Sequence, residues 1–140
     1  MTTAAVTTLP ITSDMEIAGV RQAVREVAVA VGFSLVEQTK VVTAASELAR
    51  NTLVHGGGGR LEITILEQSG GQGIRLRFSD EGPGIADVES ALADGYTTGH
   101  GLGLGLGGAR RLVQEFSIDT GPGRGTTVTV VAWPRGVRGA

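Results

Sequence analysis

The chain has 140 residues, including 23 glycines and no cysteine, and its 12 basic and 14 acidic side chains give a formal net charge of −2. This length fits one domain with its own hydrophobic core, and the lack of cysteine excludes disulfides, thiol catalysis and cysteine-ligated zinc. The slightly acidic charge balance disfavours nucleic acid as a partner. Because no apolar run reaches about 20 residues, we expect no membrane span, and because no basic residue precedes Arg21, we expect no signal peptide. We therefore expect a cytoplasmic protein.

The first helix is predicted after an ambiguous start. Residues 1–8 are small and Thr-rich and fit either a flexible tail or an edge strand. Ser13 and Glu16 then match the capping box that begins a helix. Apolar residues recur at steps of three and four up to Gly32, which is the pattern of one helical face. The predicted core positions of this helix are Ile17, Val20, Val24, Val27 and Val31.

A second helix is predicted by the same signals. Ser34 and Glu37 repeat the capping box, and the helical pattern should end at Gly56. Its predicted core side comprises Leu35, Val42, Ala45, Leu48 and Leu53.

The rest of the chain predicts β-structure with short helices. Leu61–Ile65 and Ile74–Phe78 alternate apolar with polar residues around a glycine-rich turn, as two antiparallel strands do. Helices with an antiparallel sheet predict an α/β (α+β) two-layer sandwich with the helices on one face. We expect a single domain over 1–140, with 1–8 and 135–140 as tails. The later elements are expected as short helices over 88–93 and 109–116, strands over 117–120 and 126–133, and glycine-rich loops over 95–108 and 121–125.

Glu47 and Asn51 are one helical turn apart in the second predicted helix and therefore project from the same face. An amide oxygen is a suitable ligand for Mg²⁺, and a carboxylate can take a proton from a hydroxyl or a water. The spacing is equally that of an ordinary solvated helix face.

Asp80 ends a predicted strand and begins the sequence Asp-Glu-Gly-Pro-Gly. A buried carboxylate accepts hydrogen bonds and donates none. It therefore favours an exocyclic amine, as on adenine, over the carbonyl of guanine. Gly82 and Gly84 would leave room for a flat ring, although the same residues also fit an ordinary turn.

Gly99–Gly108 alternates glycine with leucine and runs into a predicted helix. Backbone N–H groups of glycines beside the start of a helix can bind a polyphosphate. The alternative interpretation of this segment is a flexible linker. The match to the dinucleotide fingerprint within this segment lacks the preceding strand, which argues against a Rossmann dehydrogenase fragment. Gly125 and Thr126 open the last strand and, taken alone, fit a hairpin turn.

In this order the four segments resemble the N, G1, G2 and G3 boxes of the Bergerat-fold (GHKL) ATP-binding superfamily, over about residues 10–134. The resemblance implies a mixed, mainly antiparallel sheet in one HATPase-like kinase domain, and 140 residues leave no room for the further domains of gyrase, Hsp90 or histidine kinases. Residues 46–51, 94–98 and 110–112 look most like RsbT-type serine/threonine kinases of bacterial partner-switching systems. Gly107-Gly108 departs from the Pro-Gly usual there, which bears on lid stiffness.

Carried over to this sequence, the resemblance makes Glu47 the catalytic base and Asn51 the ligand of Mg²⁺. Asp80 would hydrogen-bond the adenine amine of ATP, with Thr126 helping through a water. The resemblance gives no clear role to Arg50. The glycines that it assigns to ATP are Gly82 and Gly84 in the adenine pocket and Gly101, Gly103 and Gly105 over the phosphates.

The resemblance implies an ATP-dependent kinase that phosphorylates a STAS-domain antagonist protein in a stress or sigma-factor pathway. Once released, it would activate a PP2C-type phosphatase, and the family also allows a homodimer. Two other functions stay open. One is an anti-sigma factor that sequesters a sigma subunit, against which the Glu-Leu-Ala-Arg-Asn stretch weighs. The other is a non-enzymatic ATP-gated binding module, which would not need Glu47.

Overall fold

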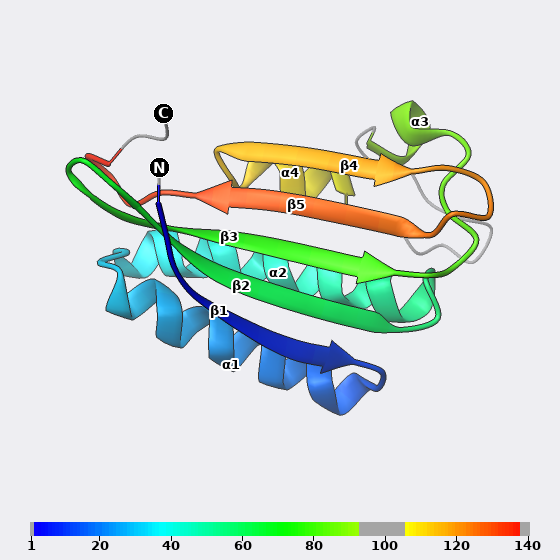
Figure 1. Ribbon diagram of the computed structural model, residues 1–140, viewed down its shortest axis with the longest axis horizontal. Helices are drawn as coiled ribbons and strands as arrows, with labels where there is room; N and C mark the ends of the chain where they lie inside the picture. Colours follow the sequence, from blue (N-terminus) through cyan, green and yellow to red (C-terminus); the bar gives the residue numbers. More distant parts are fainter. Residues whose placement is uncertain (1, 93–105, 138–140) are drawn as a thin grey trace.

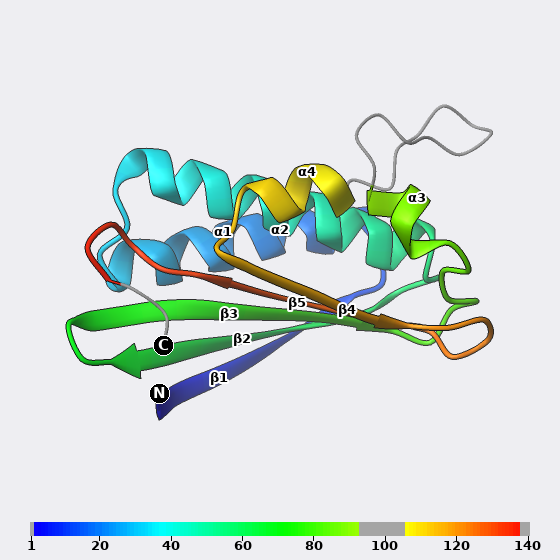
Figure 2. The same ribbon diagram turned by 90° about the horizontal axis from the view of Figure 1, so that it is seen from above.

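The computed structural model describes residues 2–92 and 106–137. Within them, five strands form one sheet in the order β1-β2-β3-β5-β4. Every neighbouring pair is antiparallel, so the described sheet is wholly antiparallel and not mixed as expected. The helices cover one face of this sheet, so the predicted two-layer architecture is confirmed (Figures 1 and 2). None of the helices in the described part combines the length and the apolarity needed to cross a membrane. The elements are β1 (Thr2–Ile11), α1 (Asp14–Ala30), α2 (Leu35–Val54), β2 (Gly59–Gln68), β3 (Gly71–Asp80), α3 (Val88–Leu92), α4 (Leu106–Arg111), β4 (Glu115–Thr120) and β5 (Thr126–Ala132).

Both expected tails are corrected where the structure describes them. Residues 2–8 belong to the edge strand β1, which pairs with β2 from Thr2 opposite Glu67 to Ile11 opposite Gly59. The backbone hydrogen bonds of this ladder hold the segment in place. At the other end, Val137 packs against Trp133 and its neighbours on the helix-free face of the sheet.

The β4 region also differs from expectation. The helical spacing over 109–116 predicts one helix, but α4 ends at Arg111, and Glu115 and Phe116 already belong to β4. Phe116 pairs with Val130 of β5. Tertiary strand pairing therefore overrides the local helical spacing here.

The two predicted capping boxes have different outcomes. At α2 the box is confirmed, because Ser34 Oγ accepts from Glu37 N at 3.2 Å and Ser34 N donates to Glu37 Oε1 at 2.8 Å. At α1 it is wrong, since the Ser13 side chain makes no capping hydrogen bond. Glu16 Oε1 instead accepts from the backbone N and the hydroxyl of Thr12, at 2.6 and 2.7 Å. The carboxylate reaches one residue further because Thr12 offers it two donors.

This contrast gives a stability prediction. Replacing Ser34 by alanine removes the acceptor of Glu37 N and should lower the free energy of unfolding by about 1 kcal/mol. Ser13→Ala is the matched control, because the Ser13 side chain makes no capping hydrogen bond. It should change the free energy of unfolding by no more than a few tenths of the change expected for Ser34→Ala. Urea unfolding of both variants measures the difference, and equal losses would contradict the assignment of the caps.

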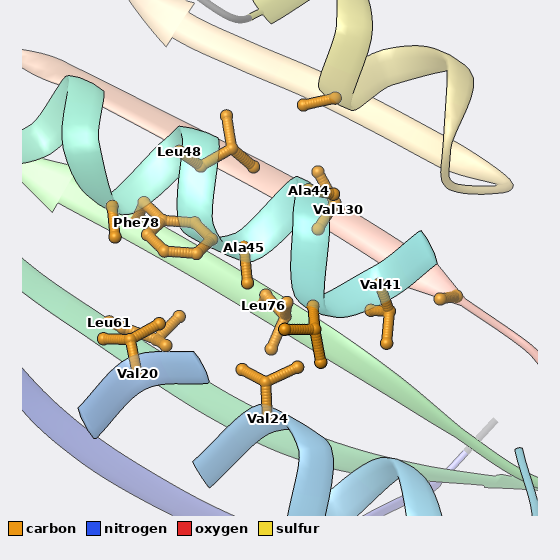
Figure 3. Close-up of a cluster of buried hydrophobic side chains, with 14 of the residues drawn as sticks. Val20, Val24, Val41, Ala44, Ala45, Leu48, Leu61, Leu76, Phe78 and Val130 are labelled. Carbon is orange, nitrogen blue, oxygen red and sulfur yellow. The ribbon is translucent and has the colours of Figure 1, made fainter. Parts of the chain in front are cut away.

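The core lies between the helices and the sheet, where α1 and α2 pack side by side over β2, β3 and β5 (Figure 3). Val20 of α1 and Leu48 of α2 meet Phe78 of β3 in one cluster. Three predicted core positions are corrected: Val27 and Leu53 are only partly buried, and Leu35 is 72% exposed. The first buried position of α2 is Val41, almost two turns after Leu35.

Candidate functional site

A cavity of about 410 Å³, counting its open mouth, lies between the C-terminal half of α2, the end of β3 and the start of β5. Apolar side chains form most of its wall, and a few polar groups face them. This composition is typical of a site for a small organic ligand. The described lining residues are Leu48, Asn51, Thr52, His55, Gly56, Phe78, Asp80, Gly84, Ile85, Leu106, Thr126 and Val128.

Asp80 stands at the end of β3, between Gly59 of β2 and Thr126 of β5 in the sheet register. Its Oδ1 atom accepts a hydrogen bond from Gly82 N at 2.9 Å, which fixes the carboxylate. Gly56 lies directly beside it, so that a Cβ atom built on Gly56 would come within 2.3 Å of Asp80 Cγ. The end of α2 can therefore approach the acid only because position 56 has no side chain.

Asn51 and Glu47 are placed differently although they lie on one helix face. Asn51 is half-buried and lines the cavity. Its Nδ2 atom is buried without a hydrogen-bond partner among the described residues. A buried polar atom of this kind normally has a partner, so the cavity offers an unfilled hydrogen-bonding position. Glu47 is exposed one turn earlier and is not among the described lining residues.

Thr126 lines the cavity beside Asp80, its partner in the register of β3 and β5, and its hydroxyl lies 2.9 Å from that of Thr120. Thr120 Oγ1 donates to Gly125 O at 3.0 Å and accepts from Ile85 N at 2.9 Å. Because a hydroxyl has one hydrogen, the hydrogen between the two threonines then comes from Thr126. Thr126 is left with lone pairs toward the cavity, which suits a water-mediated contact better than direct donation.

The glycines of the Asp-x-Gly-x-Gly segment hold two loops together. Gly84 has φ +80°, and a Cβ there would come within 2.0 Å of Gly121 O. The neighbouring Pro83 O accepts from Gly123 N at 2.7 Å. Gly84 lines the cavity. Gly82 instead lies against the backbone of Gly56, and a Cβ atom built on Gly82 would come within 2.7 Å of Gly56 Cα. Gly82 thus makes room for the end of α2 rather than for a ring.

The three lid glycines assigned to the phosphates, Gly101, Gly103 and Gly105, lie outside the described residues, as do residues 94–98. Leu106, the first residue after them, starts α4 and is buried in the cavity wall. The site therefore brings together Asn51, Asp80, Gly84 and Thr126.

Sequence reasoning missed His55 and Thr52 as lining residues. A signal was available, because positions 48, 51, 52 and 55 are spaced by three and four and share a helix face with Asn51. For Gly56 there was none beyond its place at the helix end, because its contact with Asp80 is set by tertiary packing.

Burial lowers the pKa of His55 below its ordinary value of 6.5, so its ring is neutral near pH 7. The unfolded chain, in which the pKa of His55 has its ordinary value of 6.5, takes up a proton on this ring more readily than the folded protein does. The free energy of unfolding therefore falls as the pH falls below about 6.5. We expect the unfolding temperature to fall less between about pH 7.5 and about pH 5 in His55→Gln than in the wild type. Calorimetry at both pH values measures it, and equal falls would contradict the burial of this ring.

The chain is similar in sequence to several known proteins. A family model described as Histidine kinase-, DNA gyrase B-, and HSP90-like ATPase matches residues 36–136. Serine/threonine-protein kinase RsbT of Bacillus subtilis (strain 168) is 39% identical over 125 residues, which are 89% of this chain and 94% of that protein. Anti-sigma F factor of Thermoanaerobacter sp. (strain X514) is 31% identical over 101 residues, 69% of this chain and 71% of that protein.

Two solved structures share the fold. The crystal structure of the RsbU and RsbW domains of Rv1364c from Mycobacterium tuberculosis matches with a TM-score of 0.60 and 23% identity, over 92% of this chain and 32% of that one. The SiaB-SiaC complex from Pseudomonas aeruginosa matches with a TM-score of 0.54 and 18% identity, over 93% and 89%. At these identities the likeness concerns the fold alone.

Proposed function

Because this chain belongs to the family of histidine kinase-, DNA gyrase B- and HSP90-like ATPases, we propose that it is an ATP-dependent serine/threonine-protein kinase of a partner-switching system. The observation that carries the proposal is that Asn51, Asp80 and Thr126 line the same cavity. The similarity to a serine/threonine-protein kinase over 89% of the chain supports the choice of reaction. The proposal places the enzyme in the cytoplasm, where ATP is available.

In this proposal the adenine ring enters between α2 and the sheet, and its exocyclic amine donates to Asp80. The hydrogen bond from Gly82 N to Asp80 Oδ1 holds the carboxylate in one orientation and leaves it acceptor capacity. A water between Thr126 and the ring completes the contact. The apolar walls of Leu48, Phe78 and Val128 enclose the ring faces. The lid glycines 101, 103 and 105 would hold the phosphates.

Asn51 is proposed to hold Mg²⁺ together with the phosphates. Among the described residues no group of three or more acidic, histidine or cysteine side chains could bind a metal ion, and this fits an ion that takes most of its oxygen ligands from a nucleotide and from water. The unpartnered Nδ2 position of Asn51 would hold the amide oxygen if the amide were turned over. When bound, the ion would neutralise charge on the phosphate oxygens.

Glu47 is proposed as the base that accepts the proton of the attacking hydroxyl. The bond from the γ-phosphorus to the leaving oxygen of ADP breaks as a bond to the serine or threonine oxygen forms. The proton of that hydroxyl passes to the Glu47 carboxylate. The exposure of Glu47 supports this role, because its partner is a side chain of another protein that must approach from outside.

The proposed substrate is a STAS-domain antagonist protein. A new phosphate adds about −1.5 to −2 charge at the contact surface and would weaken the complex. The released kinase would then engage a PP2C-type phosphatase, and a homodimer is compatible with the family. A second function, sequestration of a sigma subunit, is favoured by the 31% identity to anti-sigma F factor over 69% of the chain.

Phosphate transfer from labelled ATP to a panel of purified STAS domains, with GTP compared, tests the proposal. We expect transfer from ATP to at least one STAS domain and little from GTP. Capture of a sigma subunit without transfer would favour the second function. ATP binding with neither activity would leave a nucleotide-gated binding module.

A further inference from the structure

A second and larger concavity lies on the flank of α2 that faces α4. It encloses about 540 Å³ counting its open mouth, between the first turns of α2, the connection after α4 and the end of β5. We call it the α2–α4 groove. Phe33, Val41, Leu112 and Val113 give it an apolar floor, and Lys40 and Arg111 add two cationic side chains.

Among the described residues of the α2–α4 groove, the one carboxylate is already engaged. Glu37 Oε1 accepts from Ser34 N at 2.8 Å and Oε2 accepts from Arg135 N at 2.6 Å. It therefore braces the segment after β5 against α2. Lys40 forms no hydrogen bond or ion pair with another described residue. The described groove lining thus carries two basic side chains and one carboxylate, an excess of one positive charge beside apolar surface, in a chain whose net charge is −2.

The same end of the molecule has further apolar surface and a rigid rim. Leu35 and Val36, in the first turn of α2, are 72% and 65% exposed. Gln114 fixes the other rim, because its side chain donates to Trp133 O at 3.3 Å and accepts from Trp133 N at 3.1 Å. A preformed rim of this kind reduces the ordering cost of binding.

The groove is separate from the nucleotide cavity but adjoins the same short helix. Leu106 at the start of α4 lines the cavity, and Arg111 at its end lines the groove. Along α2, Lys40 and Asn51 are 11 residues apart, about 16 Å at 1.5 Å per residue. A segment docked in the groove would leave the cavity open to the nucleotide.

The geometry points to the α2–α4 groove as a docking site for an acidic segment of a partner protein, which places an apolar side chain on its floor and a carboxylate at Lys40. The identity of that partner as the phosphate acceptor rests on the proposed function. The docking itself does not. Charge complementarity selects an acidic segment, since a basic one would meet Lys40 and Arg111.

The first test needs no kinase activity. The probe is a blocked synthetic hexapeptide of two leucines between pairs of glutamates, titrated into ¹⁵N-labelled protein. We expect the amide signals of Lys40, Val41, Leu112 and Gln114 to shift, and that of Gly82 in the nucleotide site to stay. Lys40→Glu should weaken binding about tenfold or more at low salt, with a smaller effect at high salt.

The matched control is Arg60→Glu, a basic-to-acidic change at an exposed site near the start of β2. This end of the sheet lies beside Asp80 and Thr126, away from the Ala132 end that lines the groove. The control variant should bind the peptide within about twofold of the wild type, as a charge outside the contact does. A peptide with lysines in place of the glutamates should not bind. Equal losses in both variants, or a Lys40→Glu variant that binds like the wild type, would overturn the proposal.

The second test uses phosphate transfer to the STAS acceptor. Lys40→Glu should raise KM for the protein substrate about tenfold and leave the Kd for the nucleotide unchanged. An unchanged KM would show that the acceptor docks elsewhere. If the wild type transfers no phosphate but the peptide arm succeeds, the proposed function fails and the docking site stands.

Discussion

Replacing Asp80 by asparagine should abolish ATP binding, with a loss of affinity of roughly 100-fold or more. The substitution keeps the size of the side chain but removes its charge and replaces one acceptor oxygen by an amide donor. The adenine amine would then lose its acceptor or meet another donor in a partly buried site. Isothermal titration with a non-hydrolysable ATP analogue measures the loss.

The matched control for this variant is Asp119→Asn on the β4 edge. Asp119 pairs with Arg124 at 3.1 Å, but both side chains are well exposed, so the pair contributes little. Its affinity for the analogue should equal that of the wild type. Normal binding by the Asp80→Asn variant would contradict the adenine assignment.

Gly56→Ala tests the same contact from the opposite side. Its Cβ would displace the Asp80 carboxylate without changing any charge. We expect a loss of affinity of at least about tenfold, because the displaced acid no longer meets its partners. Gly19→Ala, in a part of α1 with no atom within 4 Å of the new Cβ, should leave affinity unchanged.

The second large effect concerns Glu47. Glu47→Ala should bind the ATP analogue within about twofold of the wild type yet lose phosphate transfer by about 10²- to 10⁴-fold, the range for removal of a general base. Its separation from the described cavity lining is the reason for the split between binding and transfer. Single-turnover transfer to a STAS acceptor, at saturating nucleotide, measures the chemical step.

Glu26→Ala is the corresponding control, since Glu26 is an exposed helical glutamate whose side chain, among the described residues, accepts a hydrogen bond only from Gln22. It should transfer phosphate at the wild-type rate. A Glu47→Ala variant that also transfers phosphate at the wild-type rate would exclude Glu47 as the base, and another group near the cavity would have to accept the proton.

The sequence predicted the elements whose signals are local. The capping box at Ser34 and the alternation of Leu61 and Ile63 each depend on a few neighbouring residues, and the structure confirms both. The step of four from Glu47 to Asn51 placed both on α2, but spacing alone could not tell that one is half-buried and the other exposed.

Features that depend on contacts between residues far apart in the chain could not be predicted from the sequence. The contact of Gly56 with Asp80 joins the end of α2 to the end of β3, and the hydrogen bond from Arg135 N to Glu37 joins segments 98 residues apart. Leu35 has the right helical phase for the core but precedes the part of α2 that is buried. Packing decides these cases, and a single sequence carries no signal for it.

A crystal structure of the protein with a non-hydrolysable ATP analogue and Mg²⁺ tests the central claim most directly. We expect the purine to lie between α2 and the sheet, with its exocyclic amine hydrogen-bonded to Asp80 and its phosphates on the Asn51 side. A purine bound outside this cavity, or one that turns another edge toward Asp80, would contradict it.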